Sequence, residues 1–214
     1  MVALASPAVR RFVRLGLPAL AALALAACDR NPLIVNRSAC PAVAVASYAG
    51  DISLFRPGPP DLANLDVVAT ITNVRDECTE TPDFFVSRIT YDVVARRADT
   101  AAARSVTLPL FVAVVQAGNL VNAKQIAEVQ VNFAAGQERA LASGTATANV
   151  SRRAAAVSPE ILAKINRDRK PGEIDAAVDP MSDPEVRAAL RAASFEVLLG
   201  FQLNDRALAY NVAK

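Results

Sequence analysis

Thiols are the side chains with the most distinctive chemistry in this 214-residue chain, which has three cysteines, Cys28, Cys40 and Cys78, and no histidine. A Ser-His-Asp triad, a Cys-His pair and a histidine-ligated zinc or iron site are therefore excluded. The sequence also has neither a glycine-rich phosphate loop nor a nucleophile elbow. It predicts no catalytic residue, no metal site and no cofactor, so the cysteines are the residues to which the sequence assigns a chemical role.

Cys28 stands at the end of a stretch with the profile of a signal peptide. Three arginines among the first 14 residues form a basic start, and an apolar run follows over residues 15–27. A helix needs roughly 20 apolar residues to span a bilayer, and this run is shorter. We therefore expect residues 1–27 to be a cleaved signal peptide rather than a membrane span.

The residues Leu25, Ala26, Ala27 and Cys28 resemble the lipobox of bacterial lipoproteins. The resemblance covers residues 1–28. It implies that a lipoprotein signal peptidase recognises Leu25, Ala26 and Ala27 and cuts before Cys28, whose thiol accepts a diacylglyceryl group. Acyl chains contribute about 0.8 kcal/mol per buried methylene, so two or three of them hold a protein on a membrane. The alternative is an ordinary secretory signal whose Ala-x-Ala pattern ends near Cys28.

The resemblance also implies a location in the cell envelope, with the protein anchored to a membrane and facing the periplasm. Asp29 is similar to the retention signal of inner-membrane lipoproteins in enteric bacteria, so it favours the inner membrane, with the outer membrane as the alternative. Residues 28–40 would form a lipidated tether of at most about 40 Å. The globular part is therefore expected close to the lipid surface.

Once Cys28 carries lipid, Cys40 and Cys78 remain as an even pair in an oxidising compartment. A disulfide is the economical interpretation. It would close a loop of about 38 residues, which the chain-entropy relation values at roughly 3–4 kcal/mol. A reactive thiol and a metal ligand are the rival interpretations, and no second cysteine motif or histidine supports either one.

The charge balance limits the partners. Three of the 23 basic residues and none of the 21 acidic residues lie in residues 1–27, so the mature chain carries one more acid than base. No basic surface for nucleic acid follows from this balance. The expected partners are the membrane, through the lipid anchor, and an envelope protein whose identity the sequence does not give.

Hydrophobic periodicity predicts a mainly β domain over residues 41–214. Alternating apolar residues, many of them β-branched, indicate strands, and the last one, residues 195–203, has the most apolar face and is expected to be central. Pro109 points to an edge or a bulge because it lacks an N–H. We predict an antiparallel, immunoglobulin-like β-sandwich of about seven strands, at residues 41–55 with a break at Gly50, 65–74, 84–97, 106–114, 127–133, 139–150 and 195–203.

Helix signals interrupt this pattern. Residues 158–160 and 183–185 each place a capping residue, a proline and an acid in succession, which is typical of helix starts. They predict a two-helix insertion at about 152–193, before the last strand. Asn204 or Asp205 would begin a short C-terminal helix.

Two charged segments are candidate sites with simple alternatives. Residues 75–83, expected to form a polar loop, carry carboxylates that could bind calcium or act as an acid–base pair; solvated loop acids are the alternative. The helical insertion carries six cations that could contact anionic lipid or a partner, the alternative being a solvated helix face: Arg152, Arg153, Lys164, Arg167, Arg169 and Lys170.

These observations favour a lipid-anchored periplasmic protein that acts as a non-enzymatic binding or assembly module, in contact with partners through its sandwich edges or its helices. The rival hypotheses are an envelope enzyme that uses Asp or Glu chemistry and a purely structural envelope lipoprotein. The chain as a whole resembles small envelope lipoproteins of alanine-rich proteobacteria, but no motif in its globular part points to a named family.

Overall fold

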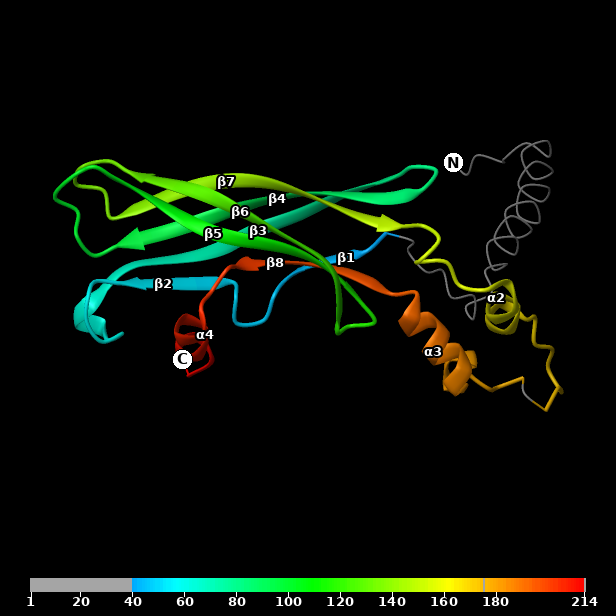
Figure 1. The fold of residues 1–214 in the computed structure, drawn as a ribbon. Coiled ribbons are helices and arrows are strands. Elements are labelled where there is room, and N and C mark those ends of the chain that lie inside the picture. Colours follow the sequence, from blue (N-terminus) through cyan, green and yellow to red (C-terminus); the bar gives the residue numbers. More distant parts are fainter. Residues whose placement is uncertain (1–39, 175, 214) are drawn as a thin grey trace, which may run out of the picture. The chain divides into compact units, whose positions relative to one another are not determined.

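A computed structural model describes residues 40–174 and 176–213. The signal peptide and the lipobox residues Leu25, Ala26, Ala27 and Cys28 lie outside the described residues, as does Asp29. The described part is mainly β, with two four-stranded sheets packed as a sandwich and three α-helices (Figure 1). None of its helices is long and apolar enough to cross a membrane.

The first sheet, sheet A, is mixed. Its β1 (Ala42–Val45) runs parallel to β8 (Phe195–Phe201), with Ala42 opposite Glu196, while the other pairs are antiparallel. The prediction of a purely antiparallel sandwich is therefore wrong. Alternation of side chains is the same in both pairing directions, so it cannot report direction. The strand order is β1 (Ala42–Val45), β8 (Phe195–Phe201), β5 (Arg104–Gln116), β6 (Leu120–Phe133).

The second sheet, sheet B, is antiparallel throughout. A turn at residues 46–50 separates β1 from β2 (Asp51–Phe55), so the first predicted strand is in fact two strands, which belong to different sheets. The described part therefore has eight strands. The order in sheet B is β2 (Asp51–Phe55), β3 (Leu65–Glu80), β4 (Phe84–Arg97), β7 (Arg139–Ser151).

The polar loop expected at residues 75–83 is largely strand. β3 continues to Glu80, and its pairing with β4 shifts between Thr72 and Arg75, where Asn73 has a φ of 51°. Past this irregularity most side chains on both faces are exposed. The alternation that marks a strand in the sequence is therefore lost. β6 is missed over residues 120–126 for the same reason, although the hairpin turn at residues 117–119 is confirmed.

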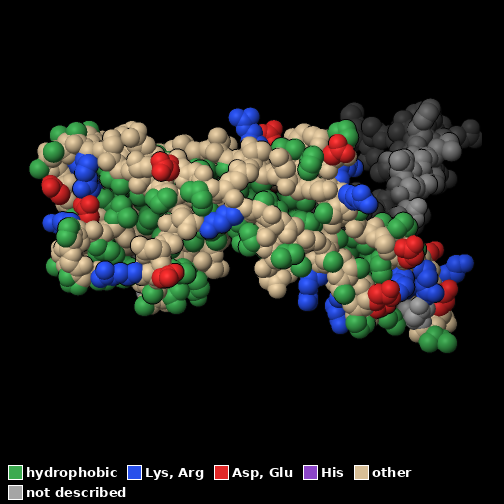
Figure 2. Space-filling view, viewed as in Figure 1, with side chains coloured by type: hydrophobic (Ala, Val, Ile, Leu, Met, Phe, Trp, Pro, Cys, Tyr) green, Lys and Arg blue, Asp and Glu red, His purple; other side chains and the backbone are tan. Residues whose placement is uncertain are grey.

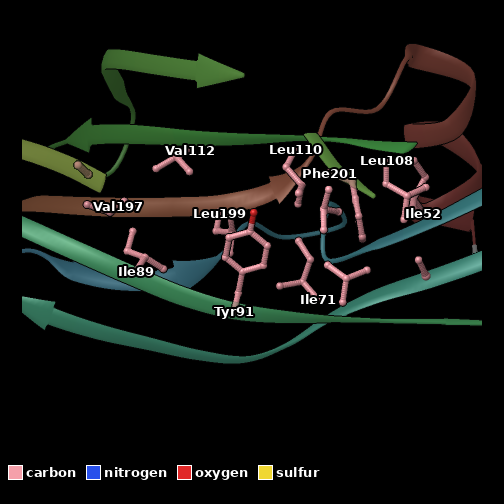
Figure 3. Close-up of a cluster of buried hydrophobic side chains, with 14 of the residues drawn as sticks. Ile52, Ile71, Ile89, Tyr91, Leu108, Leu110, Val112, Val197, Leu199 and Phe201 are labelled. Atoms are coloured by element: carbon pink, nitrogen blue, oxygen red, sulfur yellow. The ribbon is translucent and has the colours of Figure 1, made fainter. Parts of the chain in front are cut away.

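The core lies between the sheets. Phe195, Val197, Leu199 and Phe201 of β8 are all buried, and β8 lies between β1 and β5, as predicted for the central strand. Figure 3 shows Tyr91 pointing from β4 toward β8. A Cβ on Gly144 of β7 would lie 2.4 Å from the Tyr91 ring, so that position needs glycine.

The predicted helices are confirmed. The side chain of Ser158 accepts a hydrogen bond from the backbone N–H of Ile161, and that of Asp183 accepts one from Glu185, so both capping residues act as expected. The α-helices are α2 (Pro159–Asn166), α3 (Pro184–Ala192) and α4 (Asp205–Ala213), and the 3₁₀ turns are η2 (Leu62–Asn64) and η3 (Pro180–Ser182).

Candidate functional site

The predicted disulfide is present. Cys40 and Cys78 are bonded, with their Cα atoms 6.2 Å apart. Cys40 lies just before β1 of sheet A and Cys78 lies in β3 of sheet B, and both pack against the main core. The bond therefore links the two layers covalently, and neither sulfur is available as a reactive thiol or a metal ligand.

The acidic segment at residues 76–83 lies at the end of the β3–β4 hairpin. Desolvation raises the pKa of Asp76, while the hydrogen bond from the Ser87 hydroxyl, at 3.4 Å, opposes this shift. Glu80 forms an ion pair of 3.0 Å with Arg152. No group of three or more potential metal ligands occurs among the described residues. Asp76 and Glu80 are thus engaged by contacts within the fold.

Two of the six cations of the helical insertion have acidic partners within it. Lys164 pairs with Glu185 across α2 and α3, and Arg167 lies 3.8 Å from Glu173. Figure 2 shows acidic and basic side chains interspersed over these helices. The arrangement favours the solvated-face interpretation over a lipid-binding patch.

A cleft of about 480 Å³ lies between β2 and α4. Its size falls in the range of roughly 300–1,000 Å³ typical of small-molecule sites. Residues 52–58 and Pro60 line one side, from β2 and the turn after it. The other side comes from Pro109 of β5, residues 202–204 after β8, and Arg206, Ala207 and Tyr210 of α4.

Two residues of α4, Asn211 and Tyr210, hold this helix beside β2. The side-chain amide of Asn211 donates to the backbone carbonyls of Tyr48 and Asp51, each at 2.8 Å. The rings of Phe55 and Tyr210 meet edge to face, with their centroids 5.1 Å apart. The cleft therefore has one wall on a sheet edge and the other on a helix that is fastened to the same sheet.

The charged residues that line the cleft are all basic. Arg56 and Arg206 both line it, and no aspartate or glutamate does. A guanidinium nitrogen of Arg56 donates a long hydrogen bond of 3.5 Å to the Leu65 carbonyl, and Arg206 has no ion pair within the described part of the chain. Gln202 adds a buried carbonyl oxygen, Oε1, without a hydrogen-bond partner among these residues.

Sequence reasoning missed this cleft. It assigns Arg56 to a proline-rich turn and Arg206 to a terminal helix, about 150 residues apart. Pro109, expected at an edge or a bulge, lies one residue outside the β5–β8 ladder, which begins at Leu110. β8 ends at Phe201, and the next residue, Gln202, donates its backbone N–H to the Pro109 carbonyl at 2.9 Å, so both residues line the cleft.

No family model, curated protein or solved structure matches the chain. The cleft between β2 and α4 is the candidate site, because it combines a cavity with unbalanced charge.

Proposed function

We propose that the chain is a lipid-anchored, non-enzymatic binding module of the cell envelope that faces the periplasm. The cleft between β2 and α4 is the observation that carries this proposal, because it offers two arginines and apolar walls for binding. The lipobox resemblance at Cys28 supports the anchor. We include in this proposal that the sandwich is immunoglobulin-like, meaning that two packed sheets carry their loops at the two ends.

The edge strand β6 supports the assembly role that accompanies binding. Leu120, Val121 and Ile126 are each more than half exposed, and β6 pairs with β5 alone. Lys124 lies over the Phe111 ring, 4.7 Å from its centroid. A charged residue on an edge strand discourages open-ended pairing, so this edge suits a specific protein contact rather than aggregation.

The rival hypothesis of an enzyme requires a different arrangement of side chains. Asp or Glu chemistry needs two carboxyl groups that face each other with pKa values pushed apart. Asp76 has a raised pKa, yet its hydrogen-bond partner is the Ser87 hydroxyl. The binding hypothesis places its charged residues in the cleft between β2 and α4, which also has apolar walls, and this is why we prefer it.

The anchor is tested at Cys28. Replacement Cys28→Ser should abolish labelling by a fatty-acid probe and release the protein from membranes. Asp29→Ser is the matched control, because it should keep the label and change only which membrane fraction holds the protein. A Cys28→Ser variant that stays on membranes would contradict the anchor.

Binding is tested by native mass spectrometry of the full chain purified from membranes under mild conditions. We expect a non-covalent mass that is lost on denaturation. Ala207→Trp should fill the cleft and remove this mass, whereas Ala209→Trp, at an exposed position of the same helix, should keep it. A purely structural lipoprotein would carry no ligand in any of the three proteins.

A further inference from the structure

We propose that the cleft between β2 and α4 takes a small organic anion with an apolar body, whose acidic group lies between Arg56 and Arg206. This inference deepens the proposed function and rests on it, since it names the chemical class of the ligand. It follows from the charge and the walls of the cleft.

The charge selects an anion. Arg56 and Arg206 both line the recess, while the neighbouring acids Asp51, Asp61 and Asp205 are not among its lining residues. Asp51 accepts a hydrogen bond from the Thr70 hydroxyl, and Asp61 caps the backbone N–H of Asn64. Each arginine keeps donors in a planar fork that matches a carboxylate, sulfate or phosphate group. A cation at this site would meet like charge with no carboxylate to offset it.

The walls select an apolar body. Leu54, Pro57 and Leu203 line the cleft together with the Phe55 and Tyr210 ring pair. Burying apolar ligand surface against such walls removes it from water and so favours binding. An inorganic ion would contact the arginines and leave these walls in water, so it would use only part of the site.

The test compares three probes with one body and different charge, namely 4-phenylbutyrate, 4-phenylbutanol and 4-phenylbutylamine, together with inorganic phosphate. Binding to the full chain is measured by isothermal titration calorimetry in one detergent, so that partition into micelles is common to all proteins. We expect 4-phenylbutyrate to bind more tightly than the alcohol, the amine or phosphate by about tenfold or more.

Variants locate the interaction. Arg56→Gln and Arg206→Gln should each weaken 4-phenylbutyrate binding by about tenfold or more, while the corresponding lysine variants keep much of it. Arg139→Gln removes one exposed charge on β7 and should have no effect. Both cleft arginines are exposed, so unchanged circular dichroism and melting temperature are expected for these variants.

The outcomes separate the ligand class from the function. Equal affinity for the alcohol or the amine would overturn the anionic assignment, and tight binding of phosphate alone would overturn the apolar body. In both cases the proposed binding function stands. Absence of binding by every probe also overturns the ligand class, and the binding function fails with it only if the protein from membranes carries no ligand.

Discussion

Tyr91 places a phenol hydroxyl inside the sandwich, where the residue is 4% exposed. Burial raises the pKa of Tyr91 above its ordinary value, because the ionised phenolate would be poorly solvated there. The unfolded chain ionises first, from about pH 10. The contribution of Tyr91 to stability is therefore fully present below about pH 10 and is lost as the pH rises through the pKa of the folded state.

Replacement Tyr91→Phe should remove this pH dependence. We expect the free energy of unfolding of the wild type to fall more between pH 8 and about pH 11 than that of Tyr91→Phe, measured by urea titration with the disulfide intact. Tyr48→Phe, at an exposed position, should behave like the wild type. Parallel losses in the wild type and in Tyr91→Phe would contradict the role of the buried hydroxyl.

At the scale of the elements, Arg97 at the end of β4 joins two connections that lead from one sheet to the other. Its guanidinium donates to the Thr100 and Ala102 carbonyls of the β4–β5 connection, at 3.2 and 2.6 Å. It also donates to the Ala134 and Gln137 carbonyls of the β6–β7 connection, each at 2.8 Å. The side chain is thus a buried cation held by carbonyl dipoles.

The variant Arg97→Lys keeps the charge and loses the planar fork, so partly buried carbonyls lose their donors. We expect it to lower the free energy of unfolding by about 2–3 kcal/mol, as measured by urea titration. Arg96→Lys, on the exposed face of the same strand, should change stability by less than about 0.5 kcal/mol. Similar values for the two variants would show that the four carbonyl contacts of Arg97 contribute little.

At the scale of the whole molecule, the bond between Cys40 and Cys78 ties the start of the sandwich to β3 of the opposite sheet. The double variant Cys40→Ser, Cys78→Ser should lose roughly 3–4 kcal/mol of unfolding free energy. Treatment of the wild type with a reductant should lower its urea midpoint to that of the double variant, while Cys28→Ser should leave it unchanged. A wild type whose midpoint resists reduction would contradict this role.

The sequence predicts features that depend on neighbouring residues. The buried face of β8 and the caps of α2 and α3 are local patterns, and all are confirmed. The parallel pairing of β1 with β8 joins residues about 150 positions apart, and nothing in either strand encodes its direction. The cleft was missed for the same reason, since Arg56 and Arg206 share a recess only after α4 has folded back beside β2.

The pairing of β1 with β8 also sets the order in which the protein can be completed. β1 is among the first parts of the domain to leave the ribosome, and β8, its neighbour in the sheet, is among the last. A nascent chain that stops before Ser194 leaves β1 without a neighbour and exposes the β5 edge. Such products are substrates for proteases, so we expect chains that stop before β8 to be degraded rather than to accumulate.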